Sequence, residues 1–192
     1  MRAGGVVVKG GTMDEQMPSM NEKMRQQEEQ QQRIQVTGER IGNIILVLSG
    51  IGVGYKSTVA ANLAWALAEQ GNRVGLMDAD LHGPTIPLMT GLVGQRVTGS
   101  ENAIEPVPLT PNLAVMSIGF MSEDLDAPTI WRGPLRSGVL RQFSADVDWG
   151  ELDYLIIDCP PGTGDEPMTV IQLLDRPTGA IVVTTEPDTS GC

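Results

Sequence analysis

The chain has 192 residues, of which 41% are hydrophobic, and a formal net charge of −11. This length suits one domain with its own core. No apolar run in the sequence approaches the roughly 18 residues of a membrane span. The acidic balance argues against binding to nucleic acid or to an anionic membrane, because both require a basic surface. We therefore expect neither as a partner.

Cysteine and histidine are scarce. Cys159 and Cys192 lie far apart and form no disulfide framework, so a reducing cytoplasmic location is expected. The only histidine is His82, which disfavours a histidine-based metal site or Ser-His-Asp chemistry.

The first 40 residues differ in texture from the rest. Residues 1–12 are too weakly apolar for a secretory signal, so we expect a disordered leader. Residues 13–40 are rich in Gln and Glu and predict a helix. Its methionines recur at helical spacing, at Met13, Met17, Met20 and Met24. The helix either lies solvated on the main domain or docks a partner.

Residues 41–192 are expected to form one domain. Apolar runs predict strands over 44–49, 73–80, 112–119, 152–161 and 179–187. Helices are predicted over 57–71, 136–149 and 165–175, and an irregular link over 83–111. Apolar strands that alternate with helices indicate an α/β fold, with a mostly parallel sheet covered on both faces.

The loop between the first strand and helix has the features of a phosphate-binding loop. Its glycines let the backbone curl around an anion, and the start of the helix adds positive potential. Lys56 would neutralise the phosphates of ATP, and the Ser57 hydroxyl would ligate Mg²⁺. The predicted ATP-binding residues here are Gly50, Ile51, Gly52, Val53, Gly54, Tyr55, Lys56, Ser57 and Thr58.

The loop alone leaves alternatives open. The strict pattern G-x-x-x-x-G-K-[ST] requires glycine where this chain has Tyr55. Gly52-Val53-Gly54 also resembles a dinucleotide-binding loop, with Asp78 where a ribose-binding acid would sit. A glycine-rich turn with no ligand is the third alternative.

The stretch "LDYLIIDCPPGTGD" favours the phosphate-binding alternative. Asp158 ends an apolar strand, where it could hold Mg²⁺. Amides of the following loop, at Gly162 and Gly164, could meet the γ-phosphate. A dinucleotide-binding enzyme has no use for this motif here, so we predict a P-loop nucleotide-binding domain.

The stretch "LMDADLHGPTIP" supplies two further carboxylates. Asp80 is the candidate for orienting the attacking water, and with Lys56 it completes the predicted catalytic pair. Asp78 is expected nearer the metal, together with Ser57 and Asp158. The alternative is that one aspartate only forms a turn or a cap.

These motifs together resemble the Mrp-type (ApbC- and Nbp-like) P-loop ATPases that carry iron–sulfur clusters. This group belongs to the MinD/ParA class with deviant Walker A loops. The resemblance covers about residues 41–187. It rests on "VLSGIGVGYKSTVAANLAWALA", "GLMDADLHGPTIPLMTG", "MSIGFM", "WRGPLRSGVLRQF" and "WGELDYLIIDCPPGTGDEPMTVIQLL".

The resemblance implies a homodimer, or a heterodimer with a family paralogue, whose ATP sites face each other. A [4Fe-4S] cluster would bridge the subunits and pass to acceptor apoproteins. Nucleotide state, read by the segments around Asp80 and 162–165, would gate cluster binding and release.

The loop departs from the family pattern S-G-K-G-G-V-G-K-[ST]-T. Ile51 replaces the signature lysine, and Tyr55 replaces the glycine before Lys56. Losing a cation weakens hydrolysis more than binding, because that charge matters most as negative charge develops. We therefore expect weakened ATP binding and slow or absent hydrolysis.

The other departure concerns the cluster ligands. Family members continue past "VVTTEP" to a C-x-x-C pair, which this sequence lacks, so we expect a domain incomplete at its C-terminus that holds no stable cluster alone. Cys159 is expected to be a small buried residue. Two other functions stay open: a non-catalytic nucleotide-binding regulator or scaffold, and a MinD/ParA-like positioning ATPase.

Overall fold

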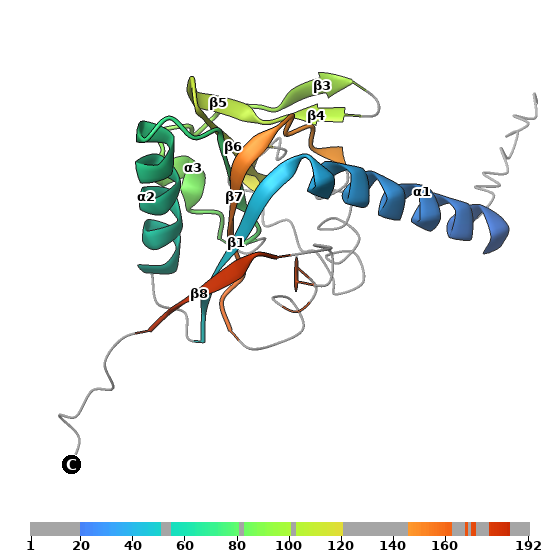
Figure 1. The fold of residues 1–192 in the computed structure, drawn as a ribbon, viewed down its shortest axis with the longest axis horizontal. Helices are drawn as coiled ribbons and strands as arrows, with labels where there is room; N and C mark the ends of the chain where they lie inside the picture. The colour runs from blue at the N-terminus through green and yellow to red at the C-terminus, as the bar shows by residue number, and fades with distance from the viewer. Residues whose placement is uncertain are drawn as a thin grey trace, which may run out of the picture.

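A computed structural model describes residues 20–50, 55–80, 83–100, 103–120, 146–162, 168, 170–171 and 177–184. Its centre is a six-stranded sheet in the order β5-β6-β2-β7-β1-β8 (Figure 1). The strands are β1 (Ile41–Ser49), β2 (Val74–Asp78), β5 (Val107–Thr110), β6 (Leu113–Ser117), β7 (Leu152–Asp158) and β8 (Gly179–Val183). Only β5 runs antiparallel to its neighbour. The predicted α/β fold with a mostly parallel sheet is confirmed.

The central strands are buried because both of their faces are covered. Every residue of β2 is buried, and the last four residues of β7 are buried as well. Such strands read as continuous apolar runs rather than as alternating patterns. This is why "VGLM" and "LIID" identified them in the sequence.

Helix α2 (Tyr55–Glu69) packs against β1, β2 and β7. Its buried face includes Ala60, Ala64 and Ala68, which recur every four residues and therefore lie on one side of the helix. Alanine side chains let the helix approach the sheet closely. This packing places the first turn of α2 beside the ends of the central strands.

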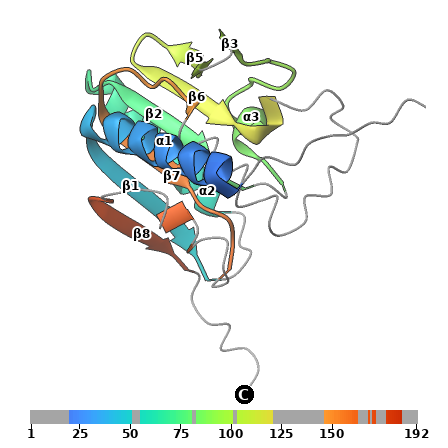
Figure 2. The same ribbon diagram turned by 90° about the vertical axis from the view of Figure 1, so that its right-hand side faces the viewer.

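Helix α1 (Met20–Glu39) projects from the start of β1, on the opposite side of the sheet from α2 (Figures 1 and 2). It lies within the predicted range 13–40; residues 1–19 lie outside the described residues. Two exposed ion pairs of 3.3 Å, Arg33–Asp146 and Arg40–Asp148, tie its C-terminal end to the domain. Exposed pairs of this kind add little stability.

The link predicted to be irregular contains regular elements. It holds α3 (Ile86–Met89), the antiparallel pair β3 (Thr98–Ser100) and β4 (Ala103–Glu105), and β5. A 3₁₀ turn, η1 (Ile118–Phe120), follows β6. These short strands depend on pairing with their neighbours, which local sequence does not reveal.

The helix predicted over 136–149 ends earlier than expected. Residues 136–145 lie outside the described part, but Val147 forms a parallel bridge with Ile104, and the Asp148 amide donates to the Ile104 carbonyl at 2.9 Å. Pairing with β4 therefore replaces helix there. Of the range 165–175, Met168, Val170 and Ile171 are helical, and the other residues lie outside the description.

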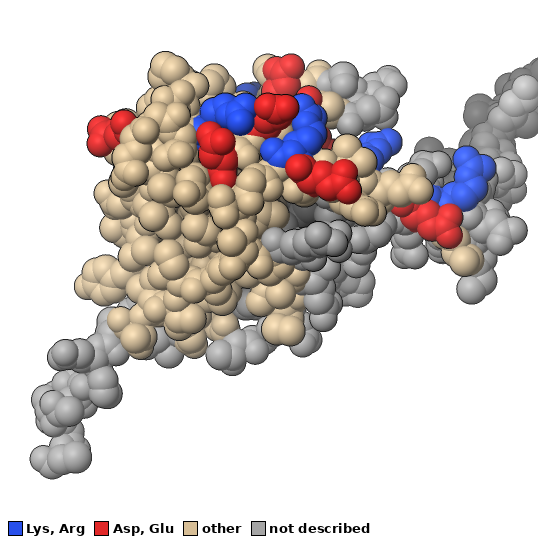
Figure 3. Space-filling model, viewed as in Figure 1, with Lys and Arg blue, Asp and Glu red and all other residues tan. Residues whose placement is uncertain are grey.

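Charged side chains gather where the parallel strands begin (Figure 3). There Arg73, just before β2, contacts Glu151 at 3.0 Å and Asp153 at 3.4 Å. The opposite edge, where the strands end, instead has buried charged groups.

Within the described ranges, no helix combines the length and apolar character needed to cross a membrane.

Candidate functional site

Two buried aspartates end adjacent strands at the carboxyl edge of the sheet. Asp78 is the last residue of β2, Asp158 is the last residue of β7, and the two are register partners. Both side chains are almost completely buried. Parallel pairing thus brings together two residues that the sequence separates by the whole β3–β6 region.

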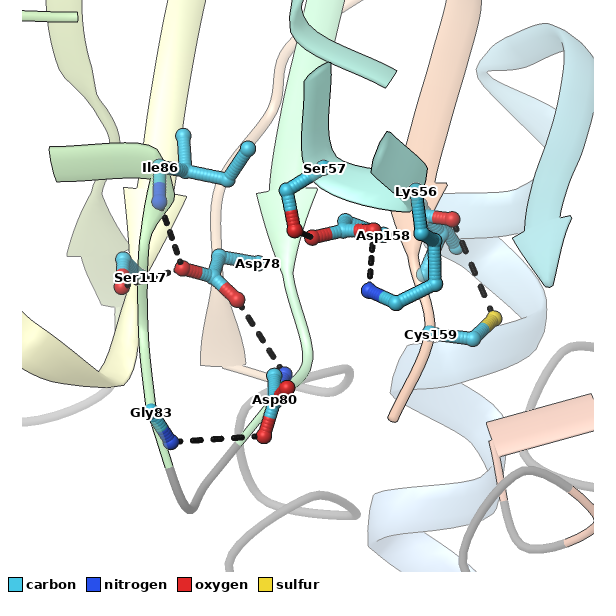
Figure 4. A network of polar contacts seen from close by, with 10 residues as sticks. Lys56, Ser57, Asp78, Asp80, Gly83, Ile86, Ser117, Asp158 and Cys159 are labelled. Carbon is cyan, nitrogen blue, oxygen red and sulfur yellow. Dashed lines mark hydrogen bonds and ion pairs between the residues drawn. The ribbon is translucent and has the colours of Figure 1, made fainter. Parts of the chain in front are cut away.

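The first turn of α2 supplies the partners of Asp158. The Lys56 ammonium forms an ion pair with Asp158 Oδ1, and the Ser57 hydroxyl donates to Oδ2 at 2.5 Å (Figure 4). Lys56 is only 3% exposed. Each carboxylate oxygen therefore contacts a different residue of the predicted phosphate-binding loop.

Burial dominates the electrostatics of this pair. It raises the pKa of the Asp158 carboxyl above its ordinary value, while Lys56 and Ser57 act in the opposite direction. A buried ion pair is stable only while both partners are present, because either charge alone would be left desolvated. Asp158 and Lys56 therefore depend on each other.

Asp78 has different partners. Its Oδ1 accepts from the Asp80 amide at 3.1 Å, and its Oδ2 accepts from the Ile86 amide and the Ser117 hydroxyl, both at 3.2 Å (Figure 4). Burial and the charge of Asp158 raise the pKa of Asp78 to about 7. Asp78 thus joins the ends of β2 and β6 to the start of α3.

Asp80 lies beyond the end of β2 and is half-buried. Its Oδ1 accepts from the Gly83 amide at 3.4 Å. Leu81 and His82 lie outside the described residues. The structure therefore places Asp80 at the same edge as Asp78 and Asp158.

The ends of β1 and β7 are joined through the backbone. The Gly162 amide donates to the Ser49 carbonyl at 3.0 Å, and Gly162 has a φ of +100°, which side-chain-bearing residues rarely adopt. Ser49 is buried, and its hydroxyl has no hydrogen-bond partner among the described residues. An unpartnered buried hydroxyl costs free energy unless a ligand or water satisfies it.

The remaining predicted loop residues divide into two groups. Tyr55 begins α2 and is 62% exposed, Gly50 follows β1 and is exposed, and Thr58 is exposed in α2. The others lie outside the described residues: Ile51, Gly52, Val53, Gly54 and Gly164.

Cys159 follows Asp158 but faces the interior. It is fully buried, and its Sγ contacts the Ile157 carbonyl at 3.8 Å. Burial raises the pKa of the thiol to about 12. The thiol therefore stays protonated near neutral pH, which suits a small buried residue and not a metal ligand.

The sequence reasoning missed Ser117, which holds Asp78 from β6. It left open that one aspartate forms a turn or a cap, but it did not identify the Ile86 amide as a partner of Asp78. "MSIGFM" contributed to the family resemblance, but nothing in that stretch identifies Ser117 as the partner of a residue on β2. Strand pairing decides that contact.

A lysine and a serine in the first helical turn, both bound to an aspartate that ends a neighbouring parallel strand, place the chain in the class of P-loop NTPases. The family model described as "ParA: NUBPL iron-transfer P-loop NTPase" matches residues 40–191. The chain belongs to this family, as the resemblance predicted.

Two relatives illustrate the similarity. The iron-sulfur cluster carrier protein of Methanocaldococcus jannaschii is 46% identical over 162 residues, which make up 84% of this chain and 56% of that protein. The cytosolic Fe-S cluster assembly factor NUBP2 homolog of Culex quinquefasciatus is 50% identical over 151 residues, 77% and 59% of the two chains. The chain thus spans a little more than half the length of these relatives.

Solved structures agree on the fold. A nucleotide-binding protein from Archaeoglobus fulgidus, in complex with ADP and containing cobalt, is 42% identical and superposes with a TM-score of 0.71. That match covers 84% of this chain and 61% of the other. The septum site-determining protein MinD of Pyrococcus horikoshii, at 24% identity and a TM-score of 0.50, supports the fold alone.

Proposed function

We propose that the chain binds ATP with Mg²⁺ at the loop between β1 and α2. The observation that carries this proposal is the meeting of Lys56 and Ser57 on Asp158. Lys56 would neutralise the phosphates, while Ser57 and Asp158 supply the oxygen ligands that Mg²⁺ prefers. The buried Ser49 hydroxyl, which has no hydrogen-bond partner among the described residues, supports a ligand there.

In ATP hydrolysis, the residues of the site would have separate roles. When bound, Mg²⁺ supplies positive charge to the phosphate oxygens of the nucleotide. The phosphates would compete with Asp158 for the Lys56 ammonium, so the ion pair holds Lys56 in place until nucleotide arrives. Asp80 would orient the attacking water. Asp78, the remaining predicted metal ligand, contacts the Asp80 and Ile86 amides and the Ser117 hydroxyl.

The cargo we propose is an iron–sulfur cluster, a [4Fe-4S] cluster delivered to acceptor apoproteins in the cytoplasm. The family and the names of both relatives support it. In the described part of the chain, no three His, Cys, Asp or Glu side chains are grouped to hold a metal. The cluster would therefore be held elsewhere, and we propose that a homodimer or a heterodimer with a paralogue provides the site.

Turnover is expected to be slow. Tyr55 stands where the family has glycine, and Ile51 where it has lysine. Tyr55 is exposed at the start of α2. This feature favours one second candidate, a regulator that binds nucleotide without hydrolysing it.

Thermal unfolding with and without Mg-ATP tests the proposal. Three chains are compared: the wild type, Lys56→Ala, and a loop revertant with Ile51→Lys, Val53→Gly, Gly54→Val and Tyr55→Gly. Binding to the folded state alone raises the unfolding temperature. We expect a small rise for the wild type, a larger one for the revertant and none for Lys56→Ala.

Phosphate release and cluster transfer complete the test. We expect measurable hydrolysis only in the revertant; brisk wild-type turnover would reject impaired hydrolysis. No temperature shift in any of the three chains would reject nucleotide binding. Transfer is measured from anaerobically reconstituted chain to an apo-ferredoxin, and failure in the presence of a full-length family paralogue would reject the carrier role.

A further inference from the structure

The two buried aspartates contact different parts of the molecule. Asp158 contacts Lys56 and Ser57, the residues of the nucleotide loop. The hydrogen bonds of Asp78 go to the segment 80–86 and to β6 instead (Figure 4). Two side chains that sequence reasoning assigned to one metal therefore have separate surroundings.

Both oxygens of Asp78 are engaged. A carboxylate has about four acceptor positions, and three are used here by two backbone amides and one hydroxyl. Each of these three bonds satisfies a donor at the carboxyl edge of the sheet. Both carboxylate oxygens of Asp78 thus accept hydrogen bonds from other groups of the protein.

One of these bonds satisfies a free amide at the start of α3. Thr85 stands at the N-cap of α3 and makes no side-chain capping bond. The Ile86 amide, which has no acceptor within the helix, donates to Asp78. Asp78 therefore bonds both the Asp80 amide just after β2 and the Ile86 amide at the start of α3.

Ser117 fixes the carboxylate from the other side. Its hydroxyl donates to Asp78 and accepts from the Gly119 amide at 3.2 Å. A Cβ added to Gly119 would lie 3.4 Å from both Pro84 and Pro87, so the segment also packs closely on η1. The end of β6 thus supports the segment by hydrogen bonding and by packing.

We propose that Asp78 is a positioning residue: supported by Ser117, it holds Asp80 and the segment 83–86 at the edge of the sheet through its bonds with the Asp80 and Ile86 amides. This proposal rests on the proposed function in one respect: the role of Asp80 in orienting the attacking water comes from there. The anchoring itself exists without nucleotide. It also explains why an aspartate is buried at this place, where its partners among the described residues are two amides and a hydroxyl and include no cation.

Amide hydrogen exchange of the nucleotide-free chain tests the anchoring. Asp78→Asn replaces one acceptor oxygen by a donor, and Ser117→Ala removes one support of the carboxylate without touching the nucleotide loop. We expect the Asp80 and Ile86 amides to exchange roughly five- to tenfold faster in both variants, as the loss of one hydrogen bond predicts. Unchanged exchange in both would overturn the proposal.

Titration of Mg²⁺ in the presence of ATP separates positioning from metal binding. If Asp78 positions the segment, the Mg²⁺ concentration at half-maximal binding changes by less than about twofold in either variant. A rise of tenfold or more in Asp78→Asn, with none in Ser117→Ala, would identify a metal ligand and overturn the proposal. Asp153→Asn, an exposed residue at the other end of β7, is the matched control.

The two proposals can fail separately. If the wild type binds no Mg-ATP, nucleotide binding is rejected, and the exchange measurement still decides the role of Asp78. If Asp78→Asn does not fold, Ser117→Ala decides alone: faster exchange at Asp80 and Ile86 supports the anchoring, and unchanged exchange rejects it.

Discussion

The Lys56 ammonium and the Asp158 carboxylate, 102 positions apart in the sequence, form a buried ion pair at the edge of the sheet. Neither group could be buried alone without a large desolvation cost. The pair therefore links the start of α2 to the end of β7, and it keeps the lysine of the nucleotide loop in place before any ligand arrives.

The first prediction removes one partner of this pair. Lys56→Met keeps the aliphatic volume but leaves Asp158 uncompensated, so the free energy of unfolding should fall by about 3 kcal/mol. Urea unfolding without nucleotide measures it. The double variant with Asp158→Asn should regain much of the loss, because no buried charge remains. Equal stability of Lys56→Met and the wild type would show that the pair contributes nothing.

The second prediction concerns pH. Burial raises the pKa of Asp78 to about 7 from an ordinary value of 3.8, so between these values the folded state holds a proton that the unfolded state has lost. The stability contributed by this group is therefore present below about pH 4 and disappears as pH rises through 7, by at most about 4 kcal/mol.

Comparing the wild type with Asp78→Asn isolates this effect. The difference in free energy of unfolding, wild type minus variant, should decrease as pH rises from 4 to 7, because the amide does not titrate. Urea unfolding is measured across this range with a chelator present. A difference that stays constant or increases with pH would contradict the assignment.

The third prediction concerns the Cys159 thiol. Its full burial and its raised pKa, about 12, predict slow reaction with a thiol reagent at pH 8 in the folded state. In a Cys192→Ser background, labelling by Ellman's reagent should be slow until urea unfolds the chain and then become fast. Rapid labelling without urea would show that Cys159 is accessible.

The fourth prediction tests the packing under β2. A Cβ added to Gly75 would lie 2.7 Å from Leu152 and 2.8 Å from Trp149, closer than real contacts allow. Gly75→Ala should therefore cost about 1–3 kcal/mol in thermal or urea unfolding. Gly179→Ala is the matched control, because a Cβ at that strand position meets nothing within 4 Å. Equal stability of the two variants would contradict the tight packing.

Much of the candidate site could be predicted from local sequence. Apolar runs that end in aspartate marked β2 and β7, and the lysine and serine after a glycine-rich loop marked the start of α2. These signals are local because a buried parallel strand must be apolar along its length and must end where polar groups begin. The structure then shows which of these groups touch.

The contacts themselves could not be predicted. Nothing in the sequence indicates that Ser57 and Lys56 each engage a different oxygen of Asp158. Nor does it indicate that Asp78 accepts from the Ile86 amide at the start of α3, because that bond depends on how α3 packs against the end of β2. The pairing of Val147 with Ile104 was missed for the same reason: a single bridge has no periodicity.

By itself the sequence determined the class of fold and the residue types at the carboxyl edge, because hydrophobic periodicity and loop chemistry are properties of neighbouring residues. Only the tertiary structure decided which groups Asp78 and Asp158 each contact. Strand order places Asp78 between β6 and β7, within reach of Ser117, and places α2 so that Lys56 reaches Asp158. The order in which strands associate depends on packing across the whole sheet, which no local stretch encodes.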